Sequence, residues 1–207
     1  QGHASDPQAQ GPLVLGLSLL PTGSADIKRM LDQAMQGQVS SDLRMGYARS
    51  LIALQDPAGA LTQLQQLTRE QPAFSPGWLL LGMLQVDLGM PAQARQSLAQ
   101  HVSLVQNSTE PEQQAGQAEA LMTLAQIAQR QGQLERAGQW LSQMPATTDP
   151  IKLASRQADL LAQQGRMDEA RLVLSQIKTT TPEQSRRKAL VLSQWLREHK
   201  QTAAAHE

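Results

Sequence analysis

The chain has 207 residues, of which 40% are apolar, so it is long enough to bury a hydrophobic core. Its 18 basic and 18 acidic side chains cancel, which excludes the net positive field that draws proteins onto nucleic acid. It has no cysteine, which excludes disulfides, thiolate nucleophiles and cysteine-based zinc sites.

The residue types that are present favour helices. Leu and Ala, which are strong helix formers, supply most of the apolar content, whereas aromatic residues make up only 2%. The longest apolar run, Leu13 to Leu20, is shorter than the roughly 18 residues that a membrane span needs. The composition therefore predicts an all-α protein with no membrane span.

The first 37 residues divide into two predicted segments. Residues 1–3, Gln-Gly-His, are typical of the remnant of a protease-cleavable purification tag, so a signal peptide or lipid anchor of the natural protein would not be visible. Residues 4–37 are predicted to form a degenerate helix pair, because Met30, Leu31 and Ala34 have helical spacing.

Two similar segments follow, at residues 38–74 and 75–117. Each contains a small residue in its second predicted helix, and these residues, Ala60 and Ala94, are 34 positions apart. The second segment also has Trp78, Leu81 and Gly82 in W-x2-L-G spacing. This pattern resembles the tetratricopeptide repeat (TPR), in which two helices form one unit of about 34 residues.

Residues 118–150 and 151–182 repeat the pattern, with Ala137 and Ala170 at a spacing of 33 positions. Ala94 and Ala137 are 43 positions apart, so the 75–117 repeat is expected to carry an extended loop of inserted residues near 106–116. Residues 183–207 are predicted to form a capping or partial-repeat helix.

The glycines of the pattern indicate where the first helix of each pair ends. Gly89, Gly132 and Gly165 are expected to adopt the left-handed conformation at these ends. Because each pair is amphipathic and cannot bury its apolar faces alone, neighbouring pairs must stack. The sequence and the TPR resemblance together predict an all-α, right-handed superhelical solenoid of antiparallel helix pairs.

No motif for catalysis is present. The sequence lacks a phosphate-binding loop, a dinucleotide fingerprint, a G-x-S-x-G elbow and an H-E-x-x-H pair, and its histidines have no metal-ligand spacing. We therefore predict a non-enzymatic protein without a metal or cofactor. Arg186, Arg187 and Lys188 form the only basic cluster, which is interpreted as a solvated helix start.

The TPR resemblance implies that the first helices of the pairs line a concave wall that binds a protein or peptide. Methionine side chains on this wall would suit varied apolar partners, and the alternative is that they pack between repeats as core. Carried onto this chain, the wall positions are Met45, Arg49, Ile52, Leu79, Met83, Val86, Met122, Gln126, Gln129, Ser155 and Asp159.

A narrower resemblance rests on three stretches, LRMGYARSLIALQDPAGALTQL, AEALMTLAQIAQRQGQLERAGQWLSQM and ASRQADLLAQQGRMDEARLVLSQI. They resemble TPR lipoproteins of Gram-negative bacteria that act as adaptors of a carboxyl-terminal processing protease. This resemblance implies such a protease as partner and a location at the periplasmic face of the outer membrane. The alternative is a cytoplasmic assembly scaffold that binds short peptide segments.

Overall fold

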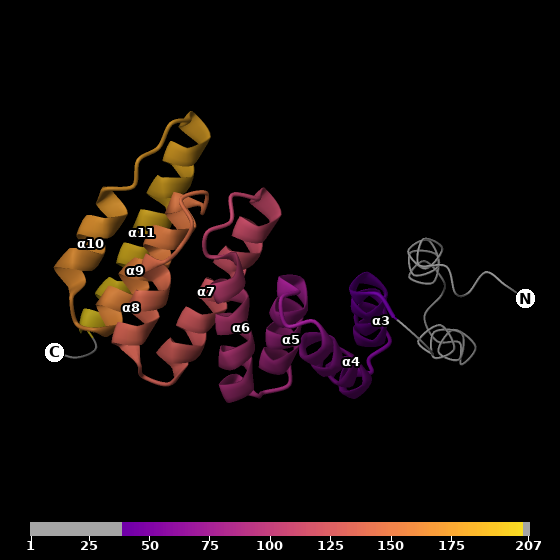
Figure 1. The fold of residues 1–207 in the computed structure, drawn as a ribbon. Helices are drawn as coiled ribbons and strands as arrows, with labels where there is room; N and C mark the ends of the chain where they lie inside the picture. Colours follow the sequence, from indigo (N-terminus) through magenta and orange to yellow (C-terminus); the bar gives the residue numbers. More distant parts are fainter. Residues whose placement is uncertain (1–38, 205–207) are drawn as a thin grey trace, which may run out of the picture. The chain divides into compact units, whose positions relative to one another are not determined.

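The computed structural model describes residues 39–204, and every regular element in that range is a helix. The described helices are numbered α3 to α11 (Figure 1). They belong to two compact units, of which unit 1 ends at Val105 and unit 2 begins at Gln106. The predicted all-α fold class of helix pairs is confirmed, and the predicted segments 1–3 and 4–37 lie outside the described residues.

Unit 1 contains two helix pairs in which each helix packs against the next one along the chain. Ser40 caps the start of α3, where its hydroxyl oxygen accepts a bond from the Leu43 N–H at 3.2 Å. Asp56 caps α4 in the same way, accepting from the Gly59 N–H at 2.9 Å. The four helices are α3 (Ser41–Ala53), α4 (Pro57–Glu70), α5 (Ser75–Asp87) and α6 (Pro91–Val105).

Small residues let the helices of unit 1 approach one another closely. Ala60 of α4 and Ala94 of α6 have no exposed surface. A Cβ atom on Gly82 of α5 would lie only 2.6 Å from Cγ of Leu98 on α6, so this contact requires glycine. The core between α3, α4 and α5 is formed mainly by Tyr47, Leu51, Leu64, Leu67, Leu81 and Leu84.

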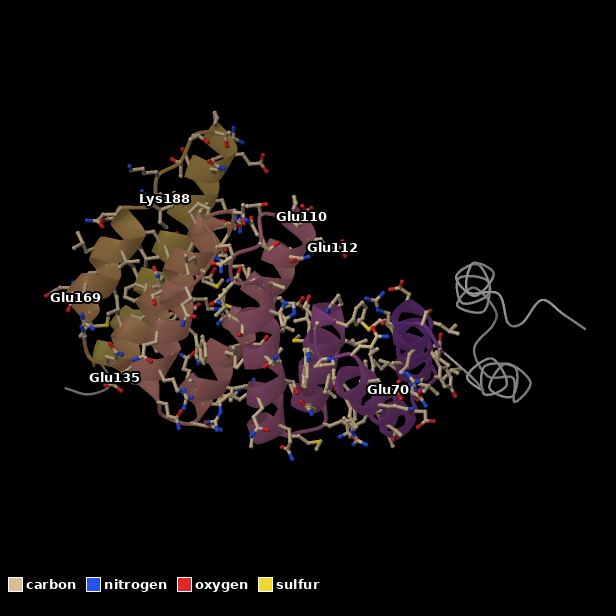
Figure 2. All side chains as sticks on the ribbon, viewed as in Figure 1. Glu70, Glu110, Glu112, Glu135, Glu169 and Lys188 are labelled. Atoms are coloured by element: carbon tan, nitrogen blue, oxygen red, sulfur yellow. The ribbon has the colours of Figure 1, made fainter. Side chains whose placement is uncertain are left out.

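One buried charge lies within the first pair of unit 1. The Arg44 guanidinium of α3 donates to Glu70 Oε2 at 3.1 Å and to Gln63 Oε1 at 3.2 Å, both on α4. Glu70 lies near the end of α4 and is labelled in Figure 2. These bonds satisfy the Arg44 side chain, which would otherwise be costly to bury.

The turns inside the pairs confirm the predicted glycine conformations. Gly89, Gly132 and Gly165 have φ angles of 70°, 71° and 76°. The turn between α3 and α4 has the same backbone conformation at Gln55, with φ 59°, although glutamine has no particular preference for it. The first pair therefore keeps the turn geometry without the glycine that the other three pairs use.

Two hydrophobic clusters among the described residues of unit 2 hold neighbouring helices together. The first lies between α7, α8 and α9 and includes Ala137 and Leu141, and the second lies between α9, α10 and α11 and includes Ala170 and Trp195. The five helices are α7 (Pro111–Arg130), α8 (Leu134–Ser142), α9 (Pro150–Gln163), α10 (Met167–Ser175) and α11 (Pro182–Ala204).

The prediction of a loop at residues 106–116 is wrong for residues 111–116, which belong to a helix. Helix α7 begins at Pro111 and runs for 20 residues, so the inserted residues mainly lengthen a helix. Pro111 occupies a first-turn position that proline favours, and Glu112 places a carboxylate at the positive end of the helix. The predicted boundary between residues 117 and 118 consequently falls inside α7.

The basic cluster at the start of α11 is not simply solvated. Arg187 pairs with Asp149, the N-cap of α9, at 2.6 Å. The Lys188 ammonium donates to the carbonyl oxygens of Ser175 and Ile177, both at 2.7 Å, at the end of α10 (Figure 2). Two of the three cations therefore also tie α11 to its neighbours in unit 2, although the Arg187 side chain remains 54% exposed.

We predict that enlarging either buried alanine destabilises its pair. Ala94→Leu in α6 and Ala170→Leu in α10 should each lower the free energy of unfolding by about 1–3 kcal/mol, because no space exists beside these side chains. Ala92→Leu, at an exposed position of α6, is the matched control and should leave the melting temperature nearly unchanged. Equal melting temperatures for Ala94→Leu and Ala92→Leu would contradict the helix register.

Candidate partner-binding surface

Met45 lies in the core of unit 1 and not on a surface. It is 6% exposed and belongs to the cluster formed by α3, α4 and α5, together with Tyr47 and Leu81. Met45 therefore packs as part of the core, which was the alternative to a place on the binding wall. A charged substitution at Met45 would disturb folding before it tested binding.

Helix α5 has apolar side chains on every face. Leu81 and Leu84 point into the core, and Trp78 and Leu80 pack against it while partly buried. The remaining apolar side chains of this helix, Leu79, Met83 and Val86, are spaced at i, i+4 and i+7 and therefore share one face. Each of these three is half-buried.

Helix α3 contributes two further predicted residues. Arg49 is exposed, and Ile52 is half-buried and packs against the α3, α4 and α5 core. We call Ile52, Leu79, Met83 and Val86, with Arg49, the unit 1 stripe. A helix that is apolar on all sides is normally buried on all sides, so the partial exposure of the α5 face leaves apolar surface for another molecule.

The predicted residues of α7 in unit 2 are less apolar. Met122 packs against the cluster that contains Ala125, Ala137 and Leu141. Gln126 and Gln129 are half-buried and offer amide groups. This part of the predicted wall can donate and accept hydrogen bonds but has little free apolar area.

Asp159 of α9 already has a partner inside unit 2. Its Oδ1 atom accepts a 2.9 Å hydrogen bond from the indole N–H of Trp195 on α11. Trp195 stacks on His199 with ring centroids 4.0 Å apart. Burial raises the pKa of Asp159 above its ordinary value, and the effect is opposed by the Trp195 bond and by the charges of His199 and Arg156.

The described residues contain no site of the kind that holds a metal. No group of three His, Asp or Glu side chains lies close enough to bind an ion within that range. The His101 ring places Nδ1 2.9 Å from the Ser75 carbonyl oxygen, and the His199 ring places Nδ1 2.9 Å from that of Trp195. No helix in the described range is long and apolar enough to cross a membrane.

Sequence reasoning missed a groove between α8, α9 and α10 of unit 2. Its volume is about 450 Å³, and the signal that could have revealed it is Gly138, a glycine in the middle of the short helix α8. The groove is lined by Glu135, Gly138, Leu141, Gln157, Leu160, Leu161, Gln164, Arg166 and Val173.

Comparison with known proteins identifies the repeat. Residues 47–111 and residues 118–143 match models of the tetratricopeptide repeat, so these two segments are similar to that repeat. No curated protein sequence matches the chain closely enough to serve as a relative.

Several solved structures have a similar fold. PilF of Pseudomonas aeruginosa is 16% identical with a TM-score of 0.61, and the match covers 99% of this chain and 90% of that one. A double mutant of MamA RS-1 is 15% identical with a TM-score of 0.64, covering 90% and 96%. YrrB, a TPR protein with an unusual peptide-binding site, is 16% identical with a TM-score of 0.62, covering 84% and 85%. At these identities the likeness shows a common fold.

We predict that Asp159 stabilises unit 2 through its hydrogen bond to Trp195 and not through its negative charge. Because its folded-state pKa is raised, this group favours folding at pH values below its unfolded pKa, and the benefit is lost as pH rises through the folded pKa. Asp159→Asn keeps the acceptor for Trp195 and removes the half-buried charge. Its melting temperature should equal or exceed that of the parent at about pH 7, with the difference shrinking toward about pH 4.

Asp159→Ala is the matched comparison. It leaves the Trp195 indole N–H without its acceptor, so it should lower the free energy of unfolding by about 1–3 kcal/mol at both pH values. If the Asn and Ala variants melt together, the hydrogen bond to Trp195 does not stabilise unit 2.

Proposed function

We propose that this TPR chain is a non-enzymatic adaptor that binds an apolar segment of a partner protein on the unit 1 stripe. TPR folds generally mediate protein-protein interaction. The observation that carries the proposal is the half-buried apolar face of α5 formed by Leu79, Met83 and Val86. The exposed Arg49 on α3 would add a cation for a partner carboxylate.

The character of the stripe decides which kind of partner it suits. Four of its five side chains are apolar, so apolar contact should supply most of the affinity. Met83 is unbranched and polarisable, and it can adjust to partner side chains of different shapes. A partner that depended on several charged contacts would fit this surface poorly, since Arg49 is its only ionised group.

We further propose a carboxyl-terminal processing protease as the first partner to test. The support for this choice is the resemblance of residues 43–64, 118–144 and 154–177 to the Gram-negative lipoprotein adaptors of such a protease. The same resemblance supports a location at the periplasmic face of the outer membrane. A cytoplasmic scaffold that binds short peptides is the alternative, and separate envelope and cytosolic extracts distinguish the two.

The proposal predicts that Leu79→Gln/Met83→Gln loses a partner that the parent chain recovers. Both chains are used as bait in envelope and cytosolic extracts of a Gram-negative host, and recovered proteins are identified by mass spectrometry. Any protein recovered is then purified, as is the protease, and its affinity is measured by calorimetry. We expect the double variant to weaken binding at least about tenfold, because two apolar contacts are replaced by amides.

Leu88→Gln is the matched control, because Leu88 is an exposed apolar residue just beyond α5 and outside the stripe. It should bind as the parent does, and circular dichroism should show that all three chains are folded. Equal recovery by the parent and the double variant would place the binding surface elsewhere. Failure of the purified protease to bind the parent would remove the protease from the proposal while leaving the adaptor role.

A further inference from the structure

The groove of unit 2 lies on a different face of α9 from the predicted concave wall. Three α9 residues, Gln157, Leu160 and Leu161, line it together with Gln164, the C-cap of α9, and the four are spaced at i, i+3, i+4 and i+7. Asp159 is two positions from both Gln157 and Leu161, so it points about 200° away around the helix. The side walls of the groove come from α8 and α10, which are the second helices of their pairs.

Gly138 opens a recess in the α8 wall. At Gly82 a Cβ atom would clash with Leu98, but at Gly138 it would meet only Leu160 Cδ2 at 3.6 Å, an ordinary contact distance. Packing therefore does not require glycine here, and a glycine inside a helix is less stable than alanine. What this glycine does provide is open space above Leu160.

The other second helices have a large residue at the position equivalent to Gly138. Each of them has a large side chain directly after its buried alanine, namely Leu61 in α4, Arg95 in α6 and Arg171 in α10. Helix α8 differs because Gly138 follows its buried Ala137. The recess is thus a local feature of this pair and not a property of every repeat in the described range.

The lining combines an apolar floor with two amides. Leu141, Leu160, Leu161 and Val173 supply the apolar surface. The Gln164 side-chain oxygen accepts from Arg166 at 3.1 Å, which leaves its NH₂ group to donate. Gln157 supplies a second amide. Such groups can bond the backbone of an extended peptide while apolar side chains occupy the floor.

The charges at the groove favour a cation in the ligand. Arg166 is neutralised by Glu169, to which it donates two bonds of 2.7 and 2.6 Å. Glu135 also lines the groove, and its carboxylate has no hydrogen bond or ion pair with any residue of the described part of the chain. Figure 2 shows Glu135 and Glu169 at the same end of unit 2. These three side chains together carry one net negative charge.

We propose that this groove is a second docking surface, which binds an extended partner segment through an apolar anchor beside a lysine or arginine. The anchor, a leucine or methionine side chain, fills the recess above Leu160, and the neighbouring cation pairs with Glu135. A volume of about 450 Å³ accommodates a few side chains and not a folded element. This surface goes beyond the adaptor role of the unit 1 stripe and does not depend on it.

A phage-displayed library of short random peptides tests the proposal. The library is selected on the parent chain and depleted on Gly138→Leu, and the enriched peptides are synthesised with a fluorescent label for anisotropy titrations. We expect them to share an apolar residue beside lysine or arginine. Their Kd should rise at least about tenfold with Gly138→Leu, which fills the recess, and with Glu135→Lys, which reverses the charge.

Three controls separate binding from folding. Gln139→Leu changes an exposed neighbour on α8 and should leave the Kd unchanged. Leu79→Gln/Met83→Gln should also bind these peptides normally, because it alters only the unit 1 stripe. Melting curves show whether Gly138→Leu is folded, and if it is not, Glu135→Lys alone decides the test.

Several results would overturn the proposal. They are a selection without enriched peptides, enrichment of peptides without a cation, and binding that Glu135→Lys does not weaken. Sedimentation analysis tests whether a second copy of this chain occupies the groove instead. If the parent forms dimers that Glu135→Lys dissociates, the groove binds a second copy of this chain and not a peptide segment.

Discussion

A small residue lies at the contact between the two helices of each pair, and the rest of the described structure depends on that contact. Ala60, Ala94, Ala137 and Ala170 have almost no exposed surface. Larger side chains at these positions would force the helices apart and move the leucines that pack around them. In the pair α5 and α6 the constraint acts from both sides, because Gly82 also admits Leu98.

Close packing inside the pairs determines which surfaces are left for other molecules. Helix α5 has more apolar side chains than its own pair and the preceding helix can cover, so Leu79, Met83 and Val86 remain partly exposed. The short helix α8 has the opposite character, because Gly138 gives it less side-chain volume than the space beside it allows. The excess apolar surface of α5 thus creates one candidate binding surface, and the missing side-chain volume of α8 creates the other.

Much of the fold could be predicted from the sequence, because the buried alanines and the turn glycines act locally. Gly89, Gly132 and Gly165 define the ends of first helices wherever they occur. The length of α7 was not predictable from composition, since residues after Pro111 have turn-forming neighbours yet satisfy the rules for a helix start. The environments of Met45 and Asp159 depend on Tyr47 and Trp195, and repeat register alone does not reveal such tertiary contacts.

Site-specific photo-crosslinking in living cells would test the central claim, that the first-helix face of α5 holds a partner protein. A photoreactive amino acid replaces Leu79 in one chain and Gln66, an exposed residue of the second helix α4, in another. The account predicts one discrete crosslinked protein from position 79 and none from position 66. Crosslinking from position 66 alone, or from neither position, would contradict it.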